Sequence, residues 1–394
     1  MTERLYYDMP ELTEFEAVVT LEHETADGRE IALDRSAFYP TSGGQPYDTG
    51  RIGFAGGEAH VTNVQADDTG EVWHTIDARI APGTAVTCRI DKERRRDHTE
   101  QHAGEHMIAG AIWELLHGTT IGLHLGSEDS SIDVTMPDGR TRLTRDEINA
   151  VEDLVNRRIR MDAPIRCYFP DPEELAALPL RKAPTVKDHV RVVQMGDFEA
   201  VACGGTHPSS TGKIGCVKIL SAEPARGKVR VTFICGGRAA KRYQELMASS
   251  DAAGALLSCP ADKLPEAVQT LRDRLTETEK NRDRLLTARM LDRLRAGEEK
   301  VPERGVSVSA AVDDDCGRGP ATEAVSRYIS DVGRIALVCA GGALVYGCSK
   351  DVSTDMCALI RKTGRGGGRP DMASGAGDAE SVRKAKEILK NTIA

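Results

Sequence analysis

The sequence predicts an α+β protein built from a small N-terminal β-barrel, a second α+β domain, a helical linker and a C-terminal α/β domain. Short β-like runs separated by glycine and aspartate turns fill residues 1–90, which is typical of a small antiparallel barrel. Residues 91–245 mix helical and strand-like patterns, whereas residues 246–298 are charged and helical. Apolar strand-like runs return in residues 299–394. We therefore expect four domains with these boundaries.

The N-terminal segment contains three runs rich in β-branched residues, at 17–21, 61–64 and 72–76. Between the first two runs, a Gly-Gly-Gln-Pro sequence at residues 43–46 predicts a tight, exposed loop with free backbone amides. Periodicity does not show what this loop faces, and a plain turn is the simplest interpretation.

The second segment is expected to hold two helices and three strands. Apolar residues at helical spacing, with no proline among them, predict a helix over residues 97–116. A second helix is expected over residues 144–160, with a Thr/Glu capping box at its start. Strands are expected at 131–134, 216–220 and 229–234. Together these elements make an α+β domain.

Two pairs of metal-binding residue types stand out in this segment. A helix places His102 and His106 on one face, one turn apart. Cys203 and His207 have the same spacing but lie between glycines and before a proline, which indicates a turn or a helix entrance. Three imidazoles and a thiolate form a set of ligands that Zn²⁺ favours. His98 is a competing ligand, and solvated histidines without a metal are the alternative.

The composition is that of an ordinary soluble globular protein. The formal net charge is −9, and residues 1–90 account for the acidity because they carry 16 acidic and 6 basic side chains. No apolar run is long enough to span a bilayer, so we expect a cytoplasmic protein without a membrane partner. Ten scattered cysteines favour reduced thiols over a disulfide framework.

The C-terminal half combines a helical seam with an α/β pattern. Leucine and valine recur at coiled-coil spacing over residues 264–275, which favours a helical hairpin or short coiled coil. A homodimer through residues 246–298 or the C-terminal domain is compatible with this seam, although the sequence does not determine an oligomeric state. Strands are expected at 335–339 and 343–346. A run of glycines flanked by arginines at 364–372, just before the last helix, predicts a phosphate-binding loop.

Four motifs give the chain a resemblance to a known family. They are Gly43-Gly44-Gln45-Pro46, His102-x-x-x-His106, Cys203-Gly204-Gly205-Thr206-His207 followed by Thr211-Gly212-x-Ile214-Gly215, and Gly366-Gly367-Gly368-Arg369-Pro370-Asp371-Met372. In these motifs the sequence resembles the freestanding editing proteins related to alanyl-tRNA synthetase, in their long form with a C-terminal glycine-rich domain. The resemblance spans almost the whole chain, and the Cys-Gly-Gly-Thr-His motif is specific.

The resemblance implies Zn²⁺ held by His102, His106, Cys203 and His207, in a deacylase domain that spans residues 91–245. It implies hydrolysis of the ester that joins serine or glycine to alanine tRNA, with the C-terminal domain holding the tRNA. The residues it implies in substrate or tRNA binding are Gly43, Gly44, Gln45, Gly204, Gly205, Thr206, Gly366, Gly367, Gly368 and Arg369.

The chain departs from the family at two positions in these motifs. Ser42 replaces a frequent third glycine, and Glu105 replaces a Gln or Thr between the two histidines. Glu105 is a candidate base, and solvent exposure or a salt link is the expectation we favour for it. Serine differs from alanine by one hydroxyl, so a selective pocket must hydrogen-bond that group. Thr119, Thr120 and His124 are the candidates, and we expect at least two of them to be ordinary loop-facing side chains.

Three functions are compatible with the sequence. The first is a zinc-dependent aminoacyl-tRNA deacylase, which the complete ligand set favours. The second is a tRNA-binding protein whose zinc is structural, because four protein ligands are typical of closed structural sites. The third is a zinc hydrolase for a small ester or amide, which does not explain the basic glycine run at 364–372.

Overall fold

The structure is a computed structural model that describes residues 1–25, 28–184, 189–301 and 304–393. It divides into two compact units, Met1–Ser249 and Ser250–Ala394, and each is described by itself. None of the described helices is both long and apolar enough to cross a membrane. All ten cysteines are free thiols.

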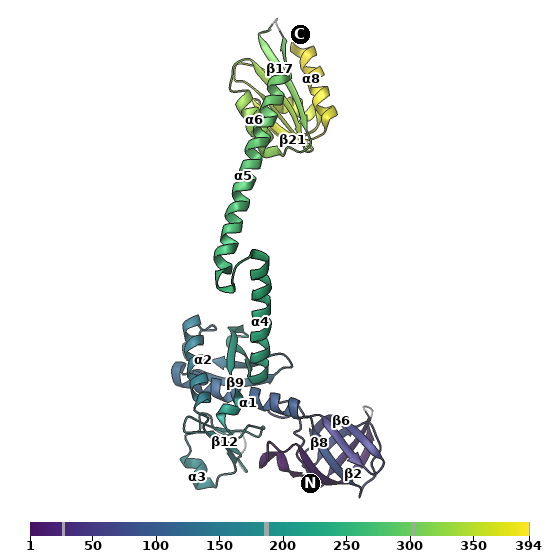
Figure 1. Cartoon of the computed structure of the whole chain (residues 1–394), viewed down its shortest axis with the longest axis vertical. Coiled ribbons are helices and arrows are strands. Elements are labelled where there is room, and N and C mark those ends of the chain that lie inside the picture. The colour runs from purple at the N-terminus through teal and green to yellow at the C-terminus, as the bar shows by residue number, and fades with distance from the viewer. Residues whose placement is uncertain (26–27, 185–188, 302–303, 394) are drawn as a thin grey trace. The chain divides into compact units, whose positions relative to one another are not determined.

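The first unit begins with a closed six-stranded β-barrel (Figure 1). Its strands, in the order in which they pair, are β2 (Glu14–Thr25), β3 (Gly28–Leu33), β7 (Val72–Ile76), β6 (Gly57–Ala66), β5 (Gly50–Phe54) and β8 (Ala85–Ile90). Two short parallel strands, β1 (Glu3–Arg4) and β4 (Arg35–Ser36), and the 3-10 helix η1 (Leu5–Tyr7) lie beside it. The expected barrel is therefore present, and all three predicted runs are strands of it.

The longest helix of the first unit, α1 (Lys92–Leu116), follows the last barrel strand directly. Asp91 caps its N-terminus by accepting hydrogen bonds from the backbone N–H groups of Glu93 and Arg94. Its C-cap residue, His117, has the left-handed backbone conformation, with φ of 55°. Arg95 forms a buried ion pair with Asp48, which fastens the start of α1 to the barrel loop.

The remainder of the first unit is an antiparallel sheet and a smaller three-stranded sheet around α1. The larger sheet has the order β14 (Val217–Ala225), β15 (Lys228–Cys235), β10 (Ser130–Thr135) and β9 (Thr119–Leu125). The smaller sheet has the order β11 (Ile165–Tyr168), β12 (Val192–Met195) and β13 (Glu199–Ala202). The other helices are α2 (Arg145–Arg160), α3 (Pro172–Ala177) and the 3-10 helix η2 (Thr211–Ile214). The predicted capping box of α2 is confirmed.

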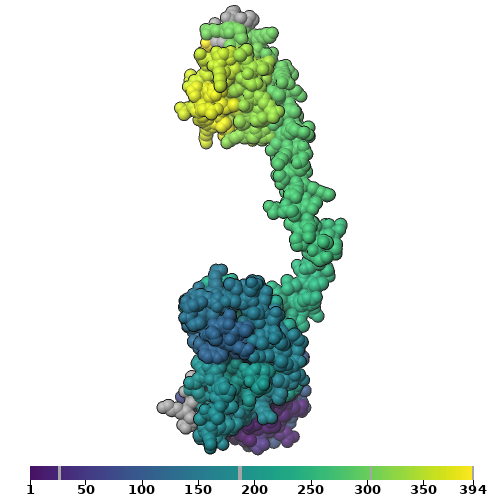
Figure 2. Space-filling view, turned by 90° about the vertical axis from the view of Figure 1, so that its left-hand side faces the viewer, coloured from purple at the N-terminus to yellow at the C-terminus, as the bar shows by residue number. Residues whose placement is uncertain are grey.

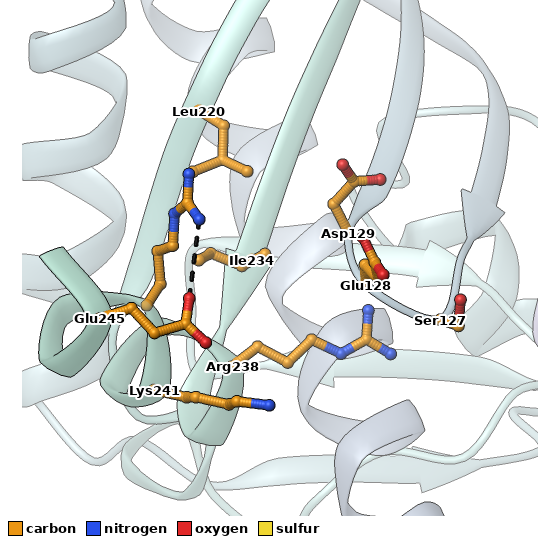
Figure 3. A pocket seen from close by; sticks show the side chains of 9 residues that line it. Ser127, Glu128, Asp129, Leu220, Ile234, Arg238, Lys241 and Glu245 are labelled. Carbon is orange, nitrogen blue, oxygen red and sulfur yellow. Dashed lines mark ion pairs between the residues drawn. The ribbon is translucent and has the colours of Figure 1, made fainter. Parts of the chain in front are cut away.

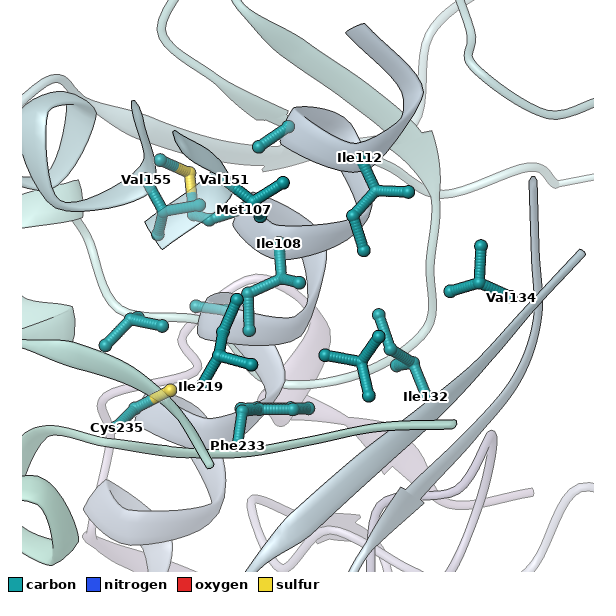
Figure 4. Packing of buried hydrophobic residues seen from close by; sticks show 14 of the residues in the cluster. Met107, Ile108, Ile112, Ile132, Val134, Val151, Val155, Ile219, Phe233 and Cys235 are labelled. Atoms are coloured by element: carbon teal, nitrogen blue, oxygen red, sulfur yellow. The ribbon is translucent and has the colours of Figure 1, made fainter. Parts of the chain in front are cut away.

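The core of this domain lies between α1, α2 and the larger sheet (Figure 4). Ile108 and Ile112 of α1 point toward β10 and β15, where Ile132 and Phe233 meet them. Small residues let α1 approach closely, because a Cβ added at Gly104 would lie 2.2 Å from the Cys235 sulfur. The middle of the helix, from His98 to Ile112, is therefore buried on all sides.

Helix α4 (Gly236–Leu257) starts after β15 and continues into the second unit. There it is followed by η3 (Ala261–Lys263) and α5 (Leu264–Ala296), which confirms the expected helical segment. On α5, Val268, Leu271 and Leu275 are exposed, so the predicted seam is left uncovered by the described part of this unit. Figure 2 shows the green surface of α5 extending beyond the body of the C-terminal domain.

The C-terminal domain is a six-stranded mixed sheet with helices on its faces. The order is β16 (Glu298–Val301), β17 (Val306–Asp313), β18 (Arg334–Ala340), β19 (Ala343–Cys348), β21 (Met372–Ala376) and β20 (Arg365–Gly368). Its helices are α6 (Arg318–Tyr328), α7 (Met356–Thr363) and α8 (Ala379–Ile393). The pair β17 and β18 is parallel, whereas the other four neighbouring pairs are antiparallel, so this domain is of the α+β class and the expected α/β class is wrong.

The glycine run differs in form from our prediction. Gly366, Gly367 and Gly368 belong to β20, the edge strand, and Arg369 lies in the turn that leads to β21. The expectation of a loop directly before the last helix is therefore wrong, because a two-stranded hairpin intervenes. The Arg-Pro-Asp turn at 369–371 explains it, since proline and aspartate favour a turn between strands.

Candidate metal centre and cleft

Four side chains from two distant segments converge at one point of the first unit. His102 and His106 come from consecutive turns of α1, whereas Cys203 and His207 come from the loop between β13 and η2. Their potential ligand atoms all lie within 4.8 Å of one another. The Cys203 sulfur is 3.4 Å from Nε2 of His102 and 3.4 Å from Nε2 of His207. This group could hold a metal ion.

The chemistry of the four donors fits zinc. Ligands bound to a tetrahedral zinc lie about 3.3–3.8 Å from one another, a range that includes the two Cys203–histidine separations of 3.4 Å. Burial lowers the pKa of His102 to about 3 and holds the pKa values of His106 and His207 well below the usual range, so all three rings are neutral. Burial raises the pKa of Cys203 to about 12, a penalty on the thiolate that a bound cation would offset.

Hydrogen bonding is also incomplete at the centre. Both ring nitrogens of His106, and Nδ1 of His207, are buried without a hydrogen-bond partner among the described residues. Such groups are rare in a folded protein unless an ion or water completes them. These unpaired ring nitrogens, the neutral rings and the thiol are all features that suit the binding of zinc.

The barrel loop supplies the support for one of these donors. The Gln45 side chain is fully buried, and its amide oxygen lies 2.8 Å from Nδ1 of His102. The same oxygen accepts a hydrogen bond from the Thr206 backbone N–H at 3.1 Å, and the Gln45 amide nitrogen donates to the Thr206 hydroxyl at 2.8 Å. If His102 donates from Nδ1, its Nε2 is left as the ligand atom.

Glycines allow the loop that carries Cys203 to lie against the His102 ring. A Cβ added at Gly205 would be 2.1 Å from Cε1 and 2.4 Å from Nδ1 of His102. At Gly204 the nearest atoms to such a Cβ belong to the Tyr7 side chain at 3.9 Å. A side chain is therefore sterically excluded at position 205 but not at position 204. Buried Arg191 then fixes the loop by donating hydrogen bonds to the carbonyls of Cys203 and Gly205, both at 2.9 Å.

A cleft of about 280 Å³ opens next to the four donors. Besides α1 and the segment at residues 201–205, it is lined by the barrel loop at Ser42 and Gly43, by strand β9, and by the segment that carries Arg181 and Lys182. Gly44 has φ of 88°, and a Cβ there would lie 2.6 Å from the Leu123 carbonyl, so the loop approaches β9 closely. The cleft is thus shaped by the barrel and the α+β domain together.

Glu105 lines this cleft and does not face bulk solvent. Its side chain is 7% exposed, and its Oε2 lies 3.2 Å from Nδ1 of His106, although the angle is not that of a hydrogen bond. The expectation of solvent exposure is therefore wrong, because α1 is covered on this face too. Burial raises the pKa of Glu105 to about 7, and the nearby Arg181 guanidinium opposes this rise.

The other predicted candidates are separated by the structure. Thr120 is 8% exposed and lines the cleft, whereas Thr119 and His124 are exposed and lie outside it. The strand register shifts beside Thr120, at the Asp133–Val134 step of β10. A β-bulge of this kind re-aims side chains, here next to a site. His98 is buried but does not belong to the four-donor group, so the chosen histidine pair is the one brought together.

Sequence reasoning missed three polar residues of the site. Arg181 donates to Glu199 Oε1 at 3.0 Å and to the Thr120 hydroxyl at 2.8 Å. Arg191 is the third, and the sequence did mark it, because a charged residue between the apolar residues 190 and 192 is unusual at a buried position. Arg181 and Glu199 carried no comparable signal, because their pairing joins a loop to a strand without any periodicity.

A second cavity of about 490 Å³ lies between the turn at 127–129 and the start of α4 (Figure 3). Its charges balance, because the lining contains three cationic residues, Arg238, Lys241 and Arg242, and three acidic residues, Glu128, Asp129 and Glu245. Arg238 is already paired with Asp97 at 2.6 Å. This cavity therefore lacks the excess positive charge that binding of a phosphate backbone requires.

Comparison with known proteins connects this geometry to a family. The family described as "tRNA synthetases class II (A)" matches residues 6–94, and that described as "Threonyl and Alanyl tRNA synthetase second additional domain" matches residues 190–232. The second match contains Cys203 and His207, half of the four-donor group. The chain is a relative of the alanyl-tRNA synthetases. The family resemblance carried by the sequence motifs is thereby confirmed.

Individual relatives extend the match to the whole chain. The alanine–tRNA ligase of Pyrococcus abyssi is 33% identical over 100% of this chain and 43% of the ligase. That of Pyrobaculum neutrophilum is 34% identical over 98% of the chain and 44% of the ligase, and that of Halorubrum lacusprofundi 32% over 100% and 44%. This relative of alanyl-tRNA synthetase thus spans less than half the length of the curated relatives it matches.

Proposed function

We propose that the chain is a zinc-dependent aminoacyl-tRNA deacylase that removes serine or glycine from mischarged alanine tRNA. The observation that carries the proposal is the four-donor group at the wall of the cleft, within the part of the chain that is related to alanyl-tRNA synthetases. In this proposal His102, His106, Cys203 and His207 hold the ion. Zinc in such a site supplies Lewis acidity to a carbonyl or a water.

The other lining residues support an ester at the end of a nucleic acid as the substrate. Exposed Lys182 lies at the cleft and suits the phosphates of a tRNA 3′ end, whereas the side chain of Arg181 beside it is buried and paired with Glu199. Glu105 is the one carboxylate among the described residues that line the cleft, so it is the group that would accept a proton from an attacking water. The Gln45 loop and Gly204–Thr206 form the wall that would hold the acyl group beside the ion.

We assign the remaining roles to residues of each unit in turn. Thr120 would contact the acyl side chain, because it alone of the three candidates lines the cleft. In the second unit, the hairpin with Gly366, Gly367, Gly368 and Arg369 would bind tRNA phosphates, and the exposed seam of α5 would support a homodimer. We place this activity in the cytoplasm, where charged tRNA is used.

The competing candidate is a tRNA-binding protein with a structural zinc. It is favoured by the number of donors, because four protein ligands usually close a zinc site, whereas catalytic sites keep an open position. The cleft beside the donors is the observation that favours catalysis instead, since a structural site has no need of one.

A deacylation assay separates the two candidates. Ser-, Gly- and Ala-tRNA(Ala) and Ser-tRNA(Ser) are incubated with the protein, with and without a zinc chelator. We expect fast loss of serine from tRNA(Ala), slow loss of alanine, little loss from Ser-tRNA(Ser), and inhibition by the chelator. Equal rates on Ser- and Ala-tRNA(Ala) would leave a general esterase, and binding of tRNA without any hydrolysis would leave the structural-zinc candidate.

A further inference from the structure

Arg181 makes two directed hydrogen bonds from a buried position beside the cleft. Its Nε donates to Glu199 Oε1 at 3.0 Å, and its Nη1 donates to the Thr120 hydroxyl oxygen at 2.8 Å. The side chains of Arg181 and Glu199 are only 8% and 4% exposed. Arginine suits this geometry because its planar guanidinium presents several N–H donors in a rigid fork.

The fold makes room for this pair. A Cβ at Gly110 of α1 would lie 2.2 Å from Glu199 Oε2, so a glycine in the helix admits the carboxylate. The Arg181 backbone N–H also donates to the Ala200 carbonyl at 3.3 Å, which fixes the arginine to the strand that carries its partner. The position of Arg181 is therefore determined by its contacts with β13, whose Glu199 packs in turn against α1, independently of any substrate.

The contact with Arg181 decides how Thr120 can hydrogen-bond. A hydroxyl has one proton to donate and two lone pairs, and Arg181 can only donate. The Thr120 oxygen thus already accepts one bond, and no described residue accepts its proton. Since Thr120 lines the cleft, its proton is available to an acceptor that enters there.

We propose that Arg181 is the positioning residue for serine selectivity, because it fixes the Thr120 hydroxyl as a donor toward the side-chain hydroxyl of the bound acyl group. This inference rests on the proposed function and names the contact that selects its substrate. A seryl ester accepts the Thr120 proton, whereas an alanyl ester displaces water from the same place and leaves the hydroxyl without a partner.

The test uses Arg181→Lys, Thr120→Val and the double variant in the full-length zinc-loaded protein. Lysine keeps the charge that pairs with Glu199 but cannot reproduce the fork that reaches Thr120. The readout is the ratio of kcat/KM for Ser-tRNA(Ala) to that for Gly-tRNA(Ala), because glycine has no side chain for Thr120 to contact. A general structural defect lowers both rates and leaves their ratio unchanged.

We expect each single variant to lower this ratio about 10- to 100-fold, as loss of one buried hydrogen bond does. The double variant should be no worse than Thr120→Val, because Arg181 acts through Thr120. Matched surface substitutions, Arg142→Lys and Thr135→Val, should leave the ratio as it is in the unaltered protein.

The outcomes separate this inference from the proposed function. If the unaltered protein prefers Ser-tRNA(Ala) but both single variants keep its Ser-to-Gly ratio, Arg181 does not position the selective group and the inference is wrong. Independent, multiplying losses in the double variant would also overturn it. Absence of hydrolysis by the unaltered protein would overturn the proposed function itself. Zinc content and melting temperature, measured on every variant, identify any variant that fails to fold. In that case Glu199→Gln tests the positioning of Arg181 through its other partner, and we expect a smaller fall in the Ser-to-Gly ratio.

Discussion

The amide oxygen of Gln45 lies 2.8 Å from Nδ1 of His102, although 57 residues separate the two in the sequence. One belongs to a barrel loop and the other to α1, so the barrel contributes to the candidate metal centre without providing one of its four donors. A partner of this kind fixes the ring orientation of a ligating histidine and makes it a better ligand.

We predict that Gln45→Ala weakens zinc binding about 10- to 100-fold, because His102 loses the acceptor that holds its ring and tautomer. Gln45→Glu should weaken it less, since a carboxylate still accepts from Nδ1 but cannot donate to Thr206. Competition with a chelator of known affinity measures both. Gln65→Ala, an exposed glutamine of the same barrel, is the control. An unchanged affinity for Gln45→Ala would show that the hydrogen bond does not support the site.

Two adjacent glycines are predicted to respond very differently to alanine. Gly205→Ala places a methyl group 2.1 Å from His102 Cε1, so the loop or the ring must move and zinc affinity should fall at least about tenfold. Gly204→Ala meets only the Tyr7 ring at 3.9 Å and should change the free energy of unfolding by less than about 0.5 kcal/mol. Equal effects of the two substitutions in a zinc titration and a thermal melt would contradict this prediction.

Cysteine substitution tests the donor group itself. Cys203→Ala removes the one anionic donor of the group, and we expect the zinc content of the purified protein to fall from about one ion per chain to near zero. Cys216→Ala, an exposed thiol in the same unit, should keep the ion. Elemental analysis measures both. Should His98→Ala lose the metal while His102→Ala keeps it, the wrong histidine pair has been chosen.

Buried His74 predicts how the first unit responds to acid. The ring lies 2.8 Å from the Ser36 hydroxyl and 3.2 Å from the Ile31 carbonyl, and burial lowers its pKa to about 4. In the unfolded chain the value is about 6.5, so below that pH the unfolded state binds a proton that the native state does not. Between pH 7 and pH 5 this difference should cost the native state about 2 kcal/mol of stability.

Urea denaturation at the two pH values checks this prediction through His74→Gln. The variant should lose less stability than the unaltered protein on going to pH 5, by about 2 kcal/mol, because glutamine does not titrate. Acid effects at the donor group are common to both proteins and cancel in the comparison. Parallel pH profiles for His74→Gln and the unaltered protein would refute a role for His74.

The C-terminal hairpin is predicted to contribute sequence-independent affinity for tRNA. Replacing exposed Arg361, Arg365 and Arg369 with Gln should weaken tRNA binding and flatten its dependence on salt, because fewer counterions are released. The slope of log Kd against log salt should fall by about 0.7–0.9 for each phosphate that the variant no longer neutralises. Filter binding at several salt concentrations provides the slope.

The control for this prediction removes the same charge elsewhere in the second unit. Arg274, Arg327 and Arg383 are exposed on three different helices, and their triple replacement with Gln should have the smaller effect. If both triple variants flatten the slope equally, the affinity arises from the general charge of the unit and the hairpin has no special role.

Much of the fold follows from local patterns in the sequence. The predicted barrel run at 72–76 has the same first and last residues as strand β7, and the predicted capping box places the start of α2 correctly. Helix α1 starts earlier than its apolar spacing indicated, because Lys92–Arg96 are charged and only the Asp91 cap marks the start. The glycine run was misplaced since glycine is rare in strands, and the turn that makes it a hairpin lies after it.

The sequence predicted the four donors and several residues that line the cleft, among them Thr120 and Gly205, but not the contacts that hold them. His102 and His106 follow from helical spacing, and the motif resemblance joined them to Cys203 and His207. The burial of Glu105 could not be predicted, because helical periodicity assumes an exposed face and α1 has almost none in its middle. The hydrogen bond between Arg181 and Thr120 joins residues 61 apart through side chains alone, and no local pattern encodes it.

The spacing of the four donors also has a consequence for the order of events while the chain is being made. The two histidines of α1 leave the ribosome about a hundred residues before Cys203, which is 101 positions after His102. Until then the nascent chain offers an ion only two of the four donors, His102 and His106, which form a weak and unselective pair. A zinc ion is thus expected to enter late, after the Cys-Gly-Gly-Thr-His segment has emerged. Metal uptake would then complete the folding of the first unit, and it would not begin it.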